Sequence, residues 1–176
     1  MESFYPGESW EQALAHEWLV TDGLGGYASG TVLGPQTRRY HGVLVAPLAP
    51  PLGRHVLVSK FEEWLEVDRQ RYPLSANEFQ DGTITPRGFE HLARFELVDG
   101  VPVWRYEAGG QPLEKRVWME RGHSTAFISY ALADSPARLH LTPLCAFRDF
   151  HRETIGSDEW RFRVEQIPPE QLSGAA

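Results

Sequence analysis

Apolar and polar side chains alternate along most of this chain, and turn-forming residues interrupt the alternation about every ten positions. Such alternation is typical of strands that bury one face, and closely spaced turns join them into antiparallel hairpins. The pattern predicts strands at residues 90–98, 103–107, 113–120, 125–132 and 138–142, with turns at Asp99-Gly100, Gly109-Gly110, 121–123 and 134–136. We therefore expect a meander over this part of the chain.

The first half of the chain combines further strands with a proline-rich segment. Its pattern predicts strands at residues 40–45 and 55–59, and either a strand or a short helical turn at residues 61–67. Three prolines deny ladder donors to residues 47–53, which predicts a loop there. Residues 9–17 fit a short helix with Ser9 as its N-cap. Many strands and little helix predict an all-β fold, an antiparallel two-sheet β-sandwich.

The length of 176 residues suits one domain with a single core. We expect this domain to cover residues 1–167, and residues 168–176 to form a linker or tail that led into something further. The net charge of −7 is the opposite of what a nucleic-acid binder usually carries, so nucleic acid is not an expected partner. No segment resembles a secretory signal or reaches a membrane-spanning length, so we expect no membrane partner and a cytoplasmic location.

The single cysteine, Cys145, stands between apolar neighbours. This setting predicts a buried small hydrophobe, and one cysteine cannot form a disulfide within the chain. A reducing compartment is consistent with both expectations.

Four glycines, Gly23, Gly25, Gly26 and Gly30, lie close together just before the segment Arg38-Arg39-Tyr40-His41. Dense glycines mark backbone that a Cβ would obstruct, and the second segment adds strong hydrogen-bond donors. Together they predict a glycine-rich loop beside a binding surface for a polar ligand. Since a solvated strand edge has the same composition, that simpler interpretation stays open at this stage.

Two cofactor motifs are matched only in part by the glycines. Residues 23–28 satisfy the dinucleotide pattern G-x-G-x-x-A, but no helical period follows and no acidic residue stands about 20 positions on. Gly25 and Gly30 have the spacing of a phosphate-binding loop, but Thr31 takes the place of the lysine that reaches the phosphates. We therefore expect no cofactor.

A second polar cluster, Arg148, Asp149 and His151, lies between phenylalanines near the end of the predicted sheet. Two interpretations are equally consistent with its spacing: a surface ion pair at a strand end, or the lining of a groove with aromatic walls. The two polar clusters are far apart in the sequence, but loops at one end of a sandwich converge from different strands. We expect the clusters to meet.

Catalytic and metal-binding residues are not predicted. The histidines and the cysteine lack metal-ligand spacing, so no metal site is expected. The carboxylate pairs are candidates for glycoside hydrolysis by residue type only, and we interpret them as solvated surface groups. They are Glu62, Glu63, Glu66, Asp158 and Glu159.

Residues 17–31 and 37–45 resemble the N-terminal domain of bacterial and archaeal glycogen-debranching enzymes of the amylo-α-1,6-glucosidase type, and residues 147–151 resemble that family's Arg-Asp-aromatic-His element. The resemblance covers about residues 17–167, with two separated motifs in the right order. It implies a supersandwich-like β-sandwich that precedes an (α/α)6 barrel, and that barrel would carry the catalytic carboxylates of this glycoside hydrolase. The implied partners are a glycogen-like α-glucan and the C-terminal barrel.

The resemblance also implies a role for seven polar residues, which would shape the edge of the substrate cleft or hold the loop that does. They are Arg38, Arg39, Tyr40, His41, Arg148, Asp149 and His151. Two alternatives remain: a stand-alone carbohydrate-binding module, and a structural domain that only docks the barrel.

Overall fold

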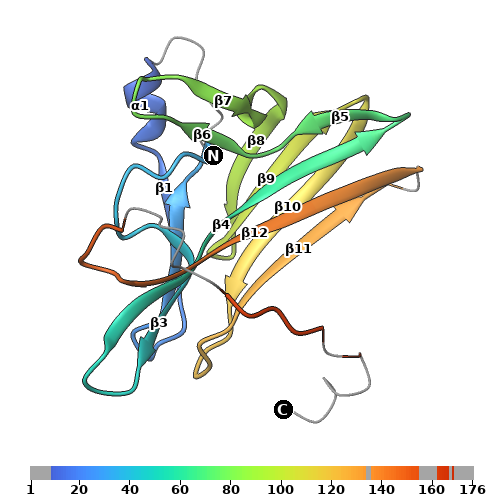
Figure 1. Cartoon of the computed structure of the whole chain (residues 1–176). Coiled ribbons are helices and arrows are strands. Elements are labelled where there is room, and N and C mark those ends of the chain that lie inside the picture. The colour runs from blue at the N-terminus through green and yellow to red at the C-terminus, as the bar shows by residue number, and fades with distance from the viewer. Residues whose placement is uncertain (1–8, 134–135, 155–161, 167, 169–176) are drawn as a thin grey trace.

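The computed structural model describes residues 9–133, 136–154, 162–166 and 168, and antiparallel strands dominate it (Figure 1). The strands are β1 (Glu17–Thr21), β2 (Tyr27–Thr31), β3 (Gly42–Leu48), β4 (Gly53–Val67), β5 (Gln70–Pro73), β6 (Ala76–Glu78), β7 (Ile84–Arg87), β8 (Leu92–Val98), β9 (Val101–Ala108), β10 (Gln111–Met119), β11 (Ala126–Leu132) and β12 (Ala137–Asp149). Helix α1 (Trp10–Leu14) and the 3-10 turn η1 (Gly88–His91) complete the described elements.

The strands form two large sheets and one small one. The first has the order β1-β2-β3-β4-β12 with β5 also on β4, the second has the order β11-β10-β9-β8, and β6 pairs with β7. Every pairing is antiparallel, because hairpins connect most neighbours. The predicted all-β, antiparallel fold class with little helix is confirmed.

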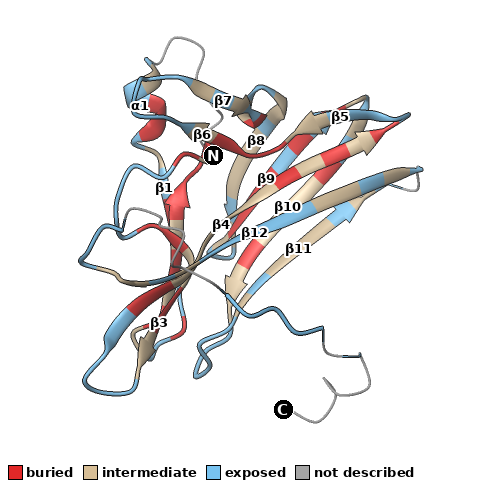
Figure 2. Cartoon of the chain, in the orientation of Figure 1, coloured by how far each residue is buried: buried red, intermediate tan, exposed pale blue. Residues whose placement is uncertain are grey.

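One apolar core joins the two large sheets. Leu65 of β4 belongs to the same cluster as Leu113 and Val117 of β10, and all three are almost fully buried. Buried positions recur along β9 and β10 (Figure 2). The indole of Trp18 in β1 meets that of Trp104 in β9 edge to face, with 5.3 Å between the ring centroids. Burial of each such side chain contributes about 1.5–3 kcal/mol, so this contact between the sheets stabilises the fold.

The predicted N-terminal helix is confirmed in a shorter form. The Ser9 hydroxyl accepts from the Gln12 amide and the Gln12 side chain accepts from the Ser9 amide, which is a capping box. The helix ends after Leu14, so the second half of the predicted range leads into β1.

The long strand β4 decides the alternative for residues 61–67, which form a strand continuous with residues 55–59. The predicted loop at residues 47–53 is wrong at both ends. Pro47 pairs with Arg54 and Leu48 pairs with Gly53, because a strand-end proline lacks only the N–H and keeps its carbonyl. The turn itself contains Ala49 to Leu52, closed by a bond from the Leu52 amide to the Ala49 oxygen.

Two burial expectations are wrong. Glu63 is 2% exposed rather than solvated, because it lies two positions before Leu65 and so shares the inward face of β4. Cys145 is exposed rather than buried. It lies on the edge strand β12, and the register with β4 shifts on both sides of it, so the alternation that predicted its burial is broken. Asp158 and Glu159 lie outside the described residues, as do Asp134, Ser135 and all of the predicted tail except residue 168.

Candidate functional site

The glycine-rich segment forms the turn of the β1–β2 hairpin. Gly23 and Gly25 have φ values of +78° and +100°, which side chains with a Cβ rarely adopt. Gly26 has no room for a Cβ, which would lie 2.2 Å from Asp22 Oδ2. Gly30 belongs to strand β2 rather than to a loop, and it lies against the Trp18 indole. Three of the four glycines therefore shape the turn, and the fourth accommodates a core side chain.

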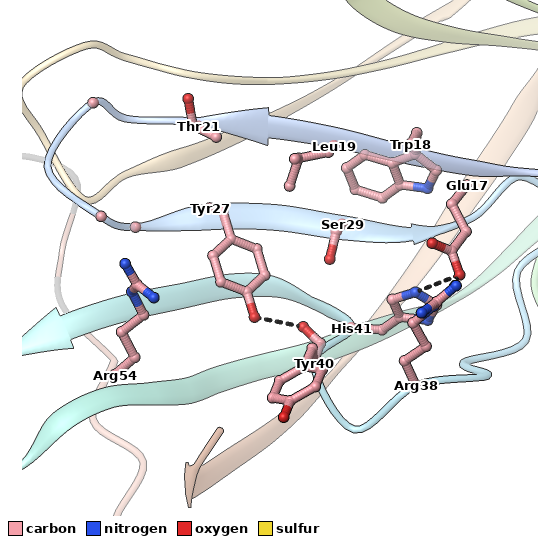
Figure 3. Close-up of a pocket in the computed structure, with 13 residues that line it drawn as sticks. Glu17, Trp18, Leu19, Thr21, Tyr27, Ser29, Arg38, Tyr40, His41 and Arg54 are labelled. Atoms are coloured by element: carbon pink, nitrogen blue, oxygen red, sulfur yellow. Dashed lines mark hydrogen bonds and ion pairs between the residues drawn. The ribbon is translucent and has the colours of Figure 1, made fainter. Parts of the chain in front are cut away.

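The segment Arg38-Arg39-Tyr40-His41 leads from β2 into β3. Glu17 Oε1 accepts from Arg38 Nε at 2.6 Å and lies 3.4 Å from His41 Nε2, so one carboxylate holds both side chains (Figure 3). The Arg38 side chain is 64% exposed, whereas His41 is 3% exposed. This leaves most of the Arg38 guanidinium free to meet a ligand.

The environment of His41 favours the neutral imidazole. Burial lowers the pKa of His41 from its ordinary value of 6.5, and the Glu17 carboxylate opposes this shift without cancelling it. The Nδ1 atom is buried without a hydrogen-bond partner in the described part of the chain. A buried polar atom of this kind is costly unless water or a ligand satisfies it.

These residues line a pocket of about 700 Å³ on the outer surface of β1 and β2. The carboxylate group of Glu17 with Arg38 and His41 lies at one end, and Arg54 of β4 lies at the other, beside Gly25 (Figure 3). The Tyr27 ring lies between them, and its hydroxyl donates to the main-chain oxygen of Tyr40 at 2.8 Å. The volume is in the range of sites for small ligands.

The two polar clusters meet, as the sequence predicted. Arg39 Nη1 donates to the main-chain oxygen of His151 at 2.9 Å, and Arg148 Nη2 donates to the main-chain oxygen of Arg39 at 2.7 Å. Tyr40 Oη lies 3.2 Å from His151 Nδ1. The loop before β3 is therefore tied to the end of β12.

The ion pair considered for Arg148 and Asp149 is not among the described contacts. Arg148 Nη1 donates to the oxygens of Arg152 at 2.5 Å and Asp149 at 3.5 Å, whereas Asp149 Oδ1 accepts from the His151 amide at 2.9 Å. Both side chains hold the backbone of the turn that follows β12.

Aromatic rings cover the junction of the two clusters. The Tyr40 ring centroid lies 5.4 Å from that of Phe150, and the Arg54 guanidinium lies 5.5 Å from the Phe150 centroid. Each cation over a ring contributes about 0.5–1 kcal/mol where it is exposed. This cluster packs the end of β12 against the pocket.

The predicted site residues thus divide into two groups. Arg38, Tyr40 and His41 line the pocket together with Gly23, Gly25 and Gly26. The side chains of Arg39, Arg148 and Asp149 bind backbone atoms instead, and the His151 ring lies against Tyr40. The lining also includes Glu17, Tyr27 and Arg54, which the sequence analysis did not identify as site residues. The first two belong to the segment that carries the family resemblance, but nothing in the sequence distinguishes Arg54.

Two further features are absent from the described residues. These residues contain no group of three or more His, Cys, Asp and Glu side chains placed to hold a metal ion. They also contain no helix long and apolar enough to cross a membrane.

Comparisons with known proteins agree with the motifs. No curated protein and no solved structure matched the chain. A family model described as the glycogen debranching enzyme N terminal matches residues 16–174, which is nearly the whole chain and includes both polar clusters. The chain therefore belongs to the family of glycogen debranching enzyme N-terminal domains.

Proposed function

We propose that this domain is the non-catalytic N-terminal part of a glycoside hydrolase that acts on α-1,6 branch points of glycogen-like α-glucans. In this proposal its pocket binds glucan hydroxyls at the edge of a cleft shared with a C-terminal (α/α)6 catalytic barrel. The observation that carries it is the open pocket in which Arg38 and His41 converge on the Glu17 carboxylate.

The chemistry of this group suits a sugar. Arg38 uses only Nε toward Glu17, so its two terminal nitrogens remain available as donors to hydroxyl oxygens. The Glu17 carboxylate has further lone pairs that accept hydrogen bonds from sugar hydroxyl groups. Leu19, which is 60% exposed, and the ring of Tyr27 supply apolar surface for the C–H face of a pyranose ring. Polar anchors over an apolar floor are the usual composition of a small-molecule site.

The two alternatives explain other features less well. A stand-alone binding module would present aromatic faces side by side to a sugar. Trp118 of β10 and Phe127 of β11 instead stack on each other, with 5.3 Å between their ring centroids and 9° between their ring planes. A domain that only docks the barrel accounts for Arg39 and Arg148, whose contacts are with backbone. It leaves the free guanidinium of Arg38 without a role.

The test is a titration of the chain with maltotetraose and with a branched α-1,6 oligosaccharide, followed by amide chemical shifts. We expect shifts at the pocket residues and a loss of affinity of about tenfold in Arg38→Ala, the effect of one charge-assisted hydrogen bond. Stability should stay within about 0.5 kcal/mol, because the side chain is largely exposed.

Arg71 provides the matched control. It is 61% exposed and bonds Glu66 through Nε at 3.2 Å, as Arg38 bonds Glu17, but it does not line the pocket. Arg71→Ala should bind as the wild type does. Equal losses in both variants, or shifts confined to other surfaces, would refute the assignment of this pocket.

A further inference from the structure

The two hairpin tips nearest the pocket come from different sheets, and they meet at Asp22. The β1–β2 hairpin belongs to the six-stranded sheet and the β10–β11 hairpin to the four-stranded sheet. Asp22 is fully buried at their junction. Its main-chain oxygen accepts from the Gly122 amide at 2.8 Å, and its Oδ2 accepts from the Ser124 hydroxyl at 2.9 Å. Asp22 therefore binds both a main-chain amide and a side chain of the β10–β11 tip.

The same carboxylate fixes the glycine turn. Asp22 Oδ1 accepts from the Leu24 amide at 2.7 Å and from the Gly26 amide at 2.9 Å. Burial raises the pKa of Asp22, but the hydrogen bonds from Leu24, Ser124 and Gly26 outweigh burial and lower it overall. The carboxylate is therefore charged at neutral pH and accepts at both oxygens.

The turn has little freedom around this contact. A Cβ on Gly26 would overlap Asp22 Oδ2 at 2.2 Å. The Arg121 side chain lies over Gly23, and a Cβ on Gly23 would lie 3.5 Å from it. Gly23, Gly25 and Gly26 also line the pocket. The end of the pocket next to Arg54 thus takes its shape from the turn, and the turn takes its shape from Asp22.

We infer that Asp22 is the positioning residue of the pocket. It holds the glycine turn in the shape that receives the ligand, and it couples this turn to the tip of the β10–β11 hairpin. The inference rests on the proposed function in that the ligand is a glucan, whereas the coupling of the two tips is a property of the unliganded chain. Hydrogen exchange of the unliganded chain tests the coupling, and glucan titration tests the positioning role.

The unliganded chain gives the first measurement, amide hydrogen exchange. In Asp22→Ala we expect exchange to accelerate at Leu24 and Gly26 on one hairpin and at Gly122 on the other. Ser124→Ala removes one hydrogen bond on the far side, and we expect it to accelerate exchange at Leu24 and Gly26 about three- to tenfold. Unchanged exchange at these two amides in Ser124→Ala, or at Gly122 in Asp22→Ala, would overturn the coupling.

Maltotetraose titration gives the second measurement. Asp22→Ala and Gly26→Ala should each weaken binding about tenfold at temperatures where the chain is folded. Asp22→Asn should restore most of the affinity, because an amide oxygen still accepts from the two turn amides. Asp81 is the control, since its Oδ1 accepts from the Thr83 amide at 2.9 Å in a turn away from the pocket. Asp81→Ala should bind normally.

The outcomes separate the two proposals. A wild-type chain that binds no oligosaccharide refutes the proposed function, and the exchange measurement still decides the coupling. Folded Asp22→Ala that binds as tightly as the wild type overturns the positioning role, even if its melting temperature falls. If Asp22→Ala does not fold, both measurements use Ser124→Ala and Asp22→Asn instead. Ser124→Ala with normal affinity and with unchanged exchange at Leu24 and Gly26 would then overturn the inference.

Discussion

Arg148 donates from Nη2 to the main-chain oxygen of Arg39 at 2.7 Å, across 109 positions of the sequence. Arg39 in turn donates to the oxygen of His151, three residues after Arg148. The two bonds close a ring between the loop before β3 and the end of β12. Two arginines that composition presents as ligand donors are therefore occupied with the backbone, and they act on the pocket through the loop that they hold.

Replacement of Arg148 by alanine should lower the free energy of unfolding by about 1–2 kcal/mol. The hydrogen bonds to the main-chain oxygens of Arg39 and Arg152 and the longer one to that of Asp149 are lost, but the side chain is half-buried, so water compensates in part. Urea unfolding measures the change. Arg152→Ala is the control, because its exposed side chain has no described contact while its oxygen remains available to Arg148. A similar loss in both variants would contradict the holding role of Arg148.

The stability of the chain should fall as the pH decreases below about 7, and His41 should cause part of this fall. Burial lowers the pKa of His41 below its ordinary 6.5, so the unfolded state takes up a proton at a higher pH than the folded state. The contribution is fully present above 6.5 and is lost as the pH falls through the window below it. Carboxylates such as Glu62, with a pKa lowered from 4.5, act at lower pH.

Urea unfolding between about pH 5 and 8 tests this pH dependence. His41→Gln should have a flatter profile in this range than the wild type. His123 is 69% exposed, and His123→Gln should keep the wild-type slope. Identical slopes in all three proteins would show that His41 does not titrate differently on folding.

The buried pair of Glu63 and Lys115 should be much more sensitive to single changes than to a joint one. Lys115 Nζ lies 2.6 Å from Glu63 Oε1, and the Tyr130 hydroxyl donates to the same oxygen. Burial, together with the charge of Glu63, raises the pKa of Tyr130, which therefore stays a donor. Glu63→Gln leaves a buried ammonium group unpaired and should cost about 3–5 kcal/mol of unfolding free energy.

The double variant Glu63→Gln/Lys115→Met should recover a large part of this loss, because it removes both charges from the core. Thermal unfolding of the single and double variants measures the recovery. The exposed pair of Arg87 and Glu90 is the comparison, and Glu90→Gln should change stability by less than about 1 kcal/mol. Additive losses in the double variant would argue against a coupled pair.

The isolated chain should release no glucose from limit dextrin. Its three described carboxylate candidates are already engaged: Glu62 with Ser75 and Asn77, Glu63 with Lys115, and Glu66 with Arg71 and His140. None stands opposite a second free carboxylate as glycoside hydrolysis requires. Glucose release that survives repurification and disappears when one of these carboxylates is replaced would contradict the prediction.

Much of the fold could be predicted from the sequence because its signals are local. The alternation and the Gly-containing turns of residues 92–132 correspond to β8 to β11, and Ser9 marks the start of α1. Hairpin neighbours are close in sequence, so their pairing follows from the turn between them. The motifs of the pocket loop and of the end of β12 were also visible, as was the family to which they belong.

The tertiary structure alone decided the role of each polar residue, because these roles depend on contacts over long sequence distances. Arg38 and Arg39 are adjacent, yet one reaches Glu17 beside the pocket and the other reaches His151. Asp22 and Ser124 meet only because one apolar core joins the two sheets. Glu63 is buried because its strand lies over Lys115 of the opposite sheet. The pattern of one strand fixes which side chains share a face, but only packing of the sheets determines what that face meets.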